Sequence, residues 1–157
     1  MGGVYFGLAT RENALLVPVN DVPDGGVHDE PAKPGLYALD MRNGRVLWQA
    51  PIDAEVCKDR GAQCAPGIAA PVTATGDLVI AGAGDGEIRV YSARSGEKLW
   101  QYDTAQTVAT VGGGSAHGGS IGGGAGPLVL GGMLIVESGY GFAGRMPGNV
   151  MLVFELP

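Results

Sequence analysis

Apolar and polar residues alternate along two stretches of this chain that repeat one another. The first stretch is 35–49 and the second is 87–101, and equivalent positions such as Trp48 and Trp100 lie 52 residues apart. Within each stretch the alternation runs through one segment, passes a glycine and resumes up to the tryptophan. A period of two on both sides of a glycine turn predicts a pair of antiparallel strands in each copy.

The turns of the two copies are Asn43-Gly44 and Ser95-Gly96. A repeat of about 50 residues that is built from strands predicts the blades of a β-propeller. Each tryptophan ends an outer strand, so we expect its ring to cover the neighbouring blade while its N–H donates to a backbone carbonyl. We therefore interpret Trp48 and Trp100 as structural residues.

The same pattern predicts an all-β fold, a β-propeller segment of about three four-stranded antiparallel blades. The expected strands are 4–10, 14–19, 36–40 and 45–49 in a first blade (1–49), 69–74, 78–82, 87–91 and 97–102 in a second (69–102), and 127–130, 133–137 and 150–155 in an incomplete third (127–157). Propellers usually close a ring of about four to eight blades, so three blades are too few. We expect either the C-terminal part of a longer protein or a piece that associates with copies of itself, because exposed blade edges promote self-association.

The long connections of this arrangement all fall on one side of the expected disc. They are residues 20–34, 50–68, 103–126 and 138–149. Repeat proteins carry insertions on the face that binds their ligands. We therefore predict that the functional site lies on this loop face.

Composition narrows the possible partners. The chain has 157 residues with 29 Gly and 10 Pro, which suits many short strands and turns, and its formal net charge is -6. This charge argues against a nucleic-acid partner, which would require a basic stripe. No apolar run reaches the roughly 18 residues of a membrane span, and the first residues lack the pattern of a signal peptide.

Two motifs carry a resemblance to a known family. The pattern of Ala38, Asp40, Gly44 and Trp48 resembles the tryptophan-docking motif of the quinoprotein propellers, and the second copy is weaker. The tail, with 117–127, 138–141 and 146–150, resembles the C-terminal blades of the polyvinyl-alcohol dehydrogenase group of pyrroloquinoline-quinone (PQQ) enzymes. The start of the chain, 2–7, is similar to the start of a blade in that group, with Phe6 in place of the expected Trp.

This resemblance implies an eight-bladed, periplasmic or secreted alcohol dehydrogenase that depends on PQQ and Ca²⁺, of which this chain would be roughly the last third. It implies a small or polymeric alcohol as substrate and an electron acceptor such as a cytochrome c. The protein would orient the cofactor, and a carboxylate would accept the hydroxyl proton as hydride moves to the quinone. No residue here matches the catalytic Asp or the Ca²⁺-binding Glu of such enzymes, and the heme attachment pattern C-x-x-C-H is absent.

Cys57 and Cys64 lie in the loop 50–68. Their spacing fits neither a C-x-x-C redox motif nor a zinc knuckle. We predict a disulfide that pins the loop, with two free thiols as the alternative. The disulfide would require an oxidising compartment.

His117, Gly118, Gly119, Ser120 and Asn149 are the candidate cofactor-binding residues. The histidine could bind a quinone carbonyl or act as a base, or it could only fix the loop through a backbone carbonyl. The residues after it could offer backbone N–H groups to a carboxylate of PQQ, or they could be glycines packed at a crowded propeller centre. Asn149 is a candidate by position alone. The glycine run leads into a strand and lacks the G-x-G-x-x-G spacing, which excludes a dinucleotide loop.

The densest acidic cluster is His28-Asp29-Glu30 with Asp21 and Asp24. Carboxylates at such close spacing could hold Ca²⁺, although their order does not follow an EF-hand, and a solvated acidic loop is the alternative. Asn20 is a further candidate contact for the cofactor or the metal.

A non-catalytic function remains open at this point. Outer-membrane assembly lipoproteins of the same superfamily use the docking motif to build a scaffold that binds protein partners, and fold alone does not decide function. The glycine-rich loop 112–126 favours the enzyme, because a peptide-binding scaffold has little use for bare backbone near the axis. We expect the 157 residues by themselves to lack dehydrogenase activity.

Overall fold

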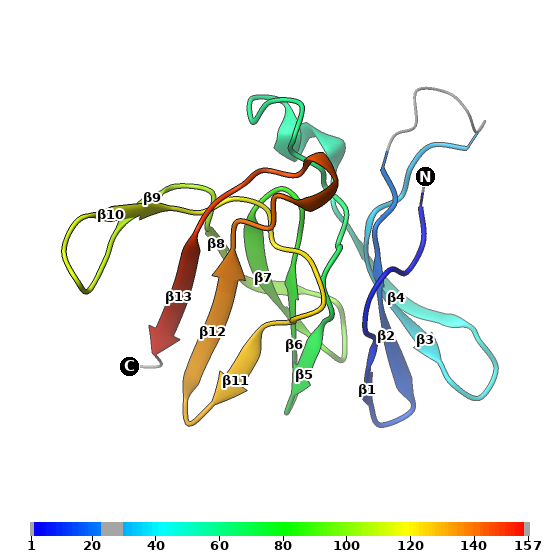
Figure 1. The fold of residues 1–157 in the computed structure, drawn as a ribbon. Helices are drawn as coiled ribbons and strands as arrows, with labels where there is room; N and C mark the ends of the chain where they lie inside the picture. Colours follow the sequence, from blue (N-terminus) through cyan, green and yellow to red (C-terminus); the bar gives the residue numbers. More distant parts are fainter. Residues whose placement is uncertain (1, 23–29, 156–157) are drawn as a thin grey trace.

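The computed structural model describes residues 2–22 and 30–155. The described chain is nearly all β, and its only helical segments are two short 3₁₀ turns, η1 (Ala54–Cys57) and η2 (Phe142–Gly144). Its sheets stand side by side with their strands roughly upright in Figure 1. This arrangement confirms the predicted β-propeller segment.

The first blade is a meander of four antiparallel strands, paired in the order β1-β2-β3-β4. Its strands are β1 (Ala9–Arg11), β2 (Ala14–Val19), β3 (Gly35–Asp40) and β4 (Val46–Pro51). The strand predicted over 4–10 is wrong in its extent, because only its end pairs with β2. Gly3 instead accepts a hydrogen bond from the backbone N–H of Asn20, so the chain before β1 packs along the end of β2.

The second blade repeats this order. Its strands are β5 (Thr73–Thr75), β6 (Leu78–Gly82), β7 (Glu87–Ser92) and β8 (Lys98–Asp103). Both blades have a register shift between the third and fourth strands, after Ala38 in one and after Val90 in the other. The shared irregularity shows that the sequence repeat is also a structural repeat.

The third sheet has three strands, β11 (Leu128–Leu130), β12 (Met133–Ser138) and β13 (Val150–Glu155). The region predicted as the loop 103–126 also contains a hairpin, β9 (Thr107–Ala109) with β10 (Ser115–His117). This hairpin projects away from the blades in Figure 1. Its strands are three residues long and close on glycines, so they gave too short an alternation to be recognised in the sequence.

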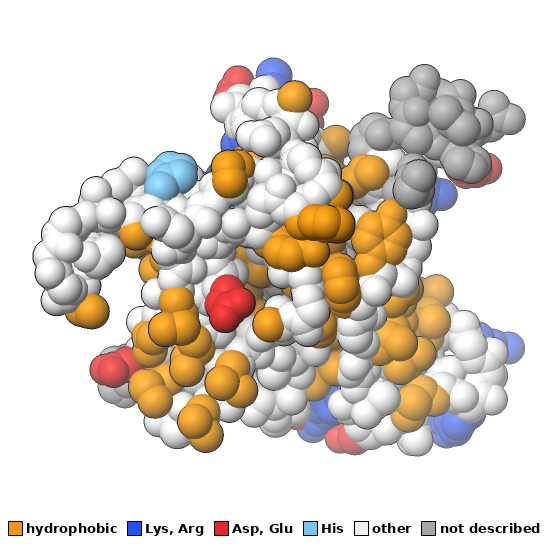
Figure 2. All heavy atoms as spheres, viewed as in Figure 1, with side chains coloured by type: hydrophobic (Ala, Val, Ile, Leu, Met, Phe, Trp, Pro, Cys, Tyr) orange, Lys and Arg blue, Asp and Glu red, His pale blue; other side chains and the backbone are white. Residues whose placement is uncertain are grey.

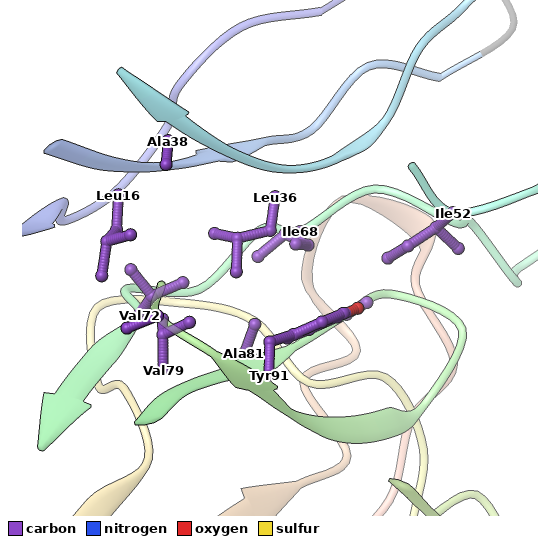
Figure 3. Close-up of a cluster of buried hydrophobic side chains, with 11 residues drawn as sticks. Leu16, Leu36, Ala38, Ile52, Ile68, Val72, Val79, Ala81 and Tyr91 are labelled. Carbon is purple, nitrogen blue, oxygen red and sulfur yellow. The ribbon is translucent and has the colours of Figure 1, made fainter. Parts of the chain in front are cut away.

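The main core lies between the first two blades. Figure 3 shows side chains of β2 and β3 facing those of β6 and β7, with Leu16, Leu36 and Val79 completely buried. Tyr91 closes this layer, and burial raises the pKa of its hydroxyl to about 12.

Trp48 fixes the outer edge of the same interface. Its indole N–H donates to the carbonyl of Ala93 at 3.1 Å, on the β7–β8 turn of the second blade. A Cβ placed on Gly96 would lie 2.5 Å from the indole ring, so the ring rests directly on that glycine. The expected function of Trp48 is therefore confirmed, and it depends on a glycine of the next blade.

Candidate functional site

The loop face is where the described chain departs most from a bare propeller. The described parts of the connections after β2, β4, β8 and β12 lie at the upper end of the sheets in Figure 1. The turns between β1 and β2, β3 and β4, β5 and β6, β7 and β8, and β11 and β12 lie at the lower end. η1 belongs to the loop after β4 and η2 to the loop after β12. The predicted one-sided arrangement is therefore present in the structure.

Two backbone segments, 117–120 and 146–149, lie alongside each other on this face and bring the candidate residues together. The N–H of Ser120 donates to the carbonyl of Met146 at 2.9 Å, and the N–H of Asn149 donates to the carbonyl of His117 at 2.9 Å. The Asn149 side chain also accepts a hydrogen bond from the N–H of His117 at 3.2 Å. The segment 117–120 is thus fixed along 146–149.

The glycines of this segment are packed against backbone. A Cβ on Gly118 would collide with the carbonyl oxygen of Thr104, and one on Gly119 would collide with the carbonyls of Met146 and Pro147. The N–H of Gly118 donates to Gln106, and the N–H of Gly119 donates to the Ser138 hydroxyl. These N–H groups already have partners inside the protein. The close packing of the backbone segments therefore explains why both positions are glycine.

Buried hydroxyl groups stabilise the pairing of these two segments. Ser120 donates from its hydroxyl to the carbonyl of Gly84 at 2.6 Å and accepts from the N–H of Met146. Thr104 and Ser138 are also buried, with their hydroxyl oxygens 2.7 Å apart. The sequence analysis did not name Thr104 or Ser138 as site residues, although Ser138 lies in the segment 138–141 that carries the family resemblance, because a single hydroxyl residue gives no pattern.

His117 is exposed, as is Asn149, whereas residues 118–120 are buried. Its Nδ1 lies 3.0 Å from the hydroxyl of Thr107 across the β9–β10 hairpin. Within residues 2–22 and 30–155, no hydrogen-bond partner is found for the other ring nitrogen, Nε2. His117 is therefore oriented by the hairpin and presents one nitrogen outward. Whether it contacts a cofactor stays a prediction.

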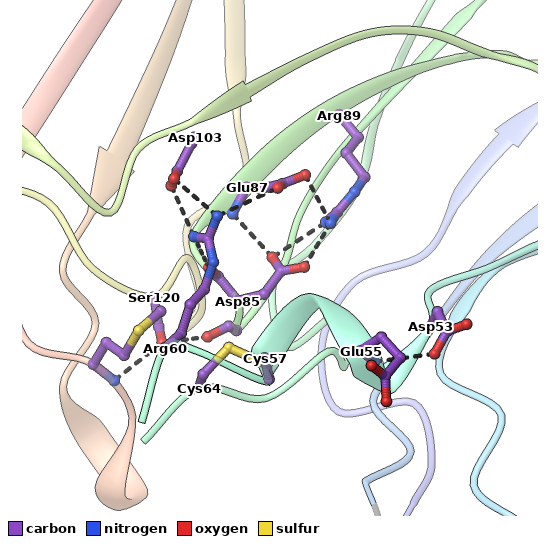
Figure 4. The surroundings of a disulfide bond; sticks show 12 residues. Asp53, Glu55, Cys57, Arg60, Cys64, Asp85, Glu87, Arg89, Asp103 and Ser120 are labelled. Carbon is purple, nitrogen blue, oxygen red and sulfur yellow. Dashed lines mark hydrogen bonds and ion pairs between the residues drawn. A yellow bond between two sulfur atoms is a disulfide. The ribbon is translucent and has the colours of Figure 1, made fainter. Parts of the chain in front are cut away.

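A charge network stands beside the disulfide (Figure 4), and its members Asp85 and Arg89 are buried while Arg60 and Asp103 are partly exposed. Arg60, from the loop after β4, forms a two-point ion pair with Asp103 at 2.8 and 2.9 Å, and this hydrogen bonding raises the pKa of the guanidinium. Arg89 lies between Asp85 and Glu87, and Asp85 is completely buried. Each charge has an opposite partner, as buried charges require. The sequence analysis did not identify this network. Arg60 and Asp103 lie 43 positions apart, and Asp85, Glu87 and Arg89, although close together in the chain, form no motif that the analysis recognised.

Cys57 and Cys64 are joined by a disulfide in the structure. It closes the loop from which Arg60 reaches Asp103. The disulfide therefore holds part of the loop face against the second blade.

The acidic cluster lies only partly within the described chain. Asp24, His28 and Asp29 fall outside the described residues. Asp21 accepts a hydrogen bond from the N–H of Lys33 at 2.8 Å, and Glu30 lies 3.7 Å from the Lys33 amine. Among the residues that the structure describes, no group of three or more His, Cys, Asp or Glu side chains could hold a metal ion.

Asn20 is buried at the end of β2, with 1% of its surface exposed. Its side-chain oxygen accepts a hydrogen bond from Arg145 at 3.4 Å, 125 positions along the chain. Gly67 leaves room for this side chain, since a Cβ there would collide with the Asn20 amide. Asn20 thus joins the first blade to the loop that contains η2.

The sequence and the fold are similar to known proteins. The family model PQQ_2, described as outer membrane protein assembly factor BamB, matches residues 22–141. A polyvinylalcohol dehydrogenase of Pseudomonas sp. is 36% identical over 167 residues, and one of Sphingopyxis sp. (strain 113P3) is 32% identical over 171 residues. Both alignments include 99% of this chain and 25% of the relative, so the chain spans about a quarter of the length of these curated relatives.

Solved structures support the fold. Quinohemoprotein alcohol dehydrogenase ADHIIG from Pseudomonas putida HK5 superposes with a TM-score of 0.60 at 21% identity, over 87% of this chain and 17% of that protein. At this level of identity the likeness establishes the β-propeller architecture alone. No helix in the described part of the chain is long and apolar enough to cross a membrane.

Proposed function

This chain belongs to the PQQ_2 repeat family of β-propellers, and on that premise we propose that it forms part of a PQQ-dependent dehydrogenase that oxidises an alcohol or polyol to a carbonyl compound. The main support is that two polyvinylalcohol dehydrogenases align with 99% of this chain at 36% and 32% identity. The loops gathered on one face of the blades are consistent with a binding site there.

The rest of the propeller is the first partner under this proposal. The outer face of the third sheet exposes the apolar residues Leu128, Leu130, Met151 and Val153. Figure 2 shows hydrophobic side chains gathered over β11, β12 and β13. A patch of this kind favours a contact with another sheet, such as a further blade. The relatives, about four times as long as this chain, contain sequence for such blades.

The residues of the loop face would bind and orient. PQQ, when bound, supplies an acceptor for two electrons, so the alcohol carbon loses a hydride and its hydroxyl loses a proton as the carbonyl forms. We assign His117, Gly118, Gly119, Ser120 and Asn149 to the wall of the cofactor site. The outward Nε2 of His117 and the amide of Asn149 are suited to polar groups of the cofactor. The glycines would contribute shape, because their N–H groups are already bonded.

The proposal also includes a metal ion and an electron acceptor. We propose Ca²⁺ beside the cofactor, with ligands outside the described residues of this chain, and a cytochrome c as acceptor. A periplasmic or secreted location fits the disulfide between Cys57 and Cys64, because disulfides persist in oxidising compartments.

The test uses the longest natural product of the gene that encodes this chain, incubated with PQQ and Ca²⁺. Dye reduction is measured with polyvinyl alcohol and with short secondary alcohols as substrates. We expect reduction that requires PQQ and an alcohol. A folded product that binds neither PQQ nor alcohol and reduces no dye would contradict the proposal.

A protein-binding scaffold is the second candidate. The description of the matching family model, an outer membrane protein assembly factor, favours it. A scaffold would retain membrane proteins in affinity capture and would not bind PQQ. That result would favour the scaffold over the dehydrogenase.

A further inference from the structure

Arg145 differs from the other basic residues of the loop face. Lys33, Lys58, Arg60 and Arg89 all lie within ion-pair distance of a carboxylate. Arg145 has no such carboxylate within the described ranges, and its only side-chain hydrogen bond there is the one to Asn20, at 3.4 Å. Most of the five donors of its guanidinium are therefore available to a ligand.

The structure nevertheless holds Arg145 in place. Its partner Asn20 is buried, and Asn20 itself is accommodated by the absence of a side chain at Gly67. The backbone N–H of Met146, the next residue, donates to the Ser120 hydroxyl at 3.1 Å. The Arg145 side chain is thus joined to the first blade through Asn20, and its neighbour Met146 joins the backbone to the glycine-rich segment.

The turn that leads into Arg145 is strained. Ala143 has φ 54° and ψ 36°, and Gly144 follows with φ 76°. The left-handed conformation costs an alanine roughly 1–2 kcal/mol, and strain of this kind tends to occur at functional sites. It makes a tight turn that directs the chain from the exposed Phe142 back toward Ser120.

The backbone N–H groups of the neighbouring segment 118–120 are not available to bind an anion. The N–H groups of Gly118, Gly119 and Ser120 are all bonded within the protein. A carboxylate on this part of the face would therefore need a side-chain donor, and a guanidinium binds carboxylates with two parallel hydrogen bonds.

We propose that Arg145 binds a carboxylate group of PQQ, with Asn20 as the residue that positions it. This inference rests on the proposed function and adds a residue to it. The carboxylate would form two charge-assisted hydrogen bonds with the guanidinium, and Asn20 would keep the side chain from turning into solvent.

The experiment follows the side-chain Nε–Hε signals of the seven arginines by NMR while this chain is titrated with PQQ. The method detects weak binding, so it suits a site to which other blades also contribute. The Arg145→Lys spectrum identifies the Arg145 signal by its loss. We expect that signal to shift most, and Arg145→Ala to weaken PQQ binding by about tenfold or more, as the loss of a charged hydrogen-bonded pair predicts. Arg145→Lys should retain part of the affinity.

The matched control is Arg45→Ala. Arg45 is exposed on the β3–β4 turn at the opposite end of the blades, and its loss changes the net charge by the same amount. We expect it to leave PQQ binding within about twofold, because exposed charges at that distance are screened by salt. Benzene-1,3,5-tricarboxylate serves as a second probe, and equal affinity for it would show a general anion site and overturn the assignment to PQQ.

The remaining outcomes separate this inference from the proposed function. If the wild-type chain binds PQQ and Arg145→Ala binds equally well, the inference is wrong and the proposed function stands. If PQQ causes no shift at Arg145 while the full gene product still reduces dye with PQQ, the inference alone is again overturned. If neither experiment shows PQQ binding, the two proposals fall together.

Discussion

Equivalent tryptophans of the repeat, Trp48 and Trp100, lie at the two interfaces between blades, and they differ in how closely the next blade packs against them. Between the first and second blades, Trp48 rests on Gly96 and donates to Ala93, above a well-filled core. Between the second and third, Trp100 is 38% exposed and contacts Phe154 of β13 edge-on at 5.2 Å. No acceptor for the Trp100 N–H is found in the described chain.

The space around the two rings differs accordingly. An apolar groove of about 740 Å³ runs along the second interface, lined by residues that include Leu78, Val90, Trp100, Leu134 and Phe154. The buried cluster there is also smaller, centred on Ile80, Ile88, Ile121 and Val136. A docked tryptophan thus needs both its own ring, from one blade, and a glycine turn of the next blade on which the ring can rest. A motif within one blade describes only half of the contact.

The largest effect should come from removing the docked ring. Trp48→Ala should lower the free energy of unfolding by about 4 kcal/mol, whereas Trp100→Ala should cost only about 1 kcal/mol because its ring is packed on fewer sides. Urea unfolding followed by far-UV circular dichroism measures both. Equal losses for the two variants would contradict the comparison.

Gly96→Ala tests the partner side of the same contact. An alanine here must adopt φ 73° and must also displace the Trp48 ring, so we expect a loss of about 3 kcal/mol. Gly44→Ala is the matched control. Gly44 has nearly the same φ, 71°, and nothing within 4 Å of the new Cβ, so backbone strain alone should cost about 1 kcal/mol. Similar losses would show that the ring does not rest on Gly96.

The exposed face of the third sheet predicts self-association of the isolated chain. Met151→Lys with Val153→Lys should lower the proportion of oligomer, while the free energy of unfolding changes by less than about 1 kcal/mol, because both side chains are exposed. Analytical ultracentrifugation at several concentrations measures the oligomer. As a control, Met41→Lys changes an exposed apolar residue on a turn of the first blade and should leave association unchanged. The same oligomer content in all three proteins would contradict this prediction.

The smallest effect distinguishes the two turns. Hydrogen bonds from the side chain and the backbone N–H of Arg42 lower the pKa of Asp40 from 3.8 to about 2, whereas the second blade has Ser92 at that position. A lowered folded-state pKa contributes stability that is present above the unfolded value and is lost as the pH falls toward 2. The unfolding midpoint should therefore fall between about pH 4 and pH 2, and less steeply in Asp40→Asn. A Ser92→Ala variant should keep the wild-type slope, and identical slopes in Asp40→Asn and wild type would contradict the assignment.

The repeat made most of the fold predictable. Strand alternation and the glycine turns are local, so β2, β3, β6, β7, β12 and β13 lie within one or two residues of their predicted ranges. The first strand of each four-stranded blade, β1 or β5, is shorter than predicted, because its length depends on pairing with β2 or β6. The β9–β10 hairpin was missed for a related reason, since three-residue strands show too little alternation.

The candidate site was predictable in position but not in chemistry. Residues 117–120 and Asn149 meet on the loop face, as their place in long connections indicated. The bonding of their N–H groups was not predictable, because the partners Gln106, Ser138 and Met146 come from other segments.

The sequence by itself determined the blades, the turns and the docking residue Trp48, because period-two alternation and turn glycines act between near neighbours. Only the tertiary structure decided which polar groups remain available. It placed Asn20 against Arg145 and Arg60 against Asp103, pairs separated by 125 and 43 positions. Such pairs depend on how whole blades and loops pack, since hydrogen bonds and ion pairs form only between atoms that the fold brings within a few ångströms.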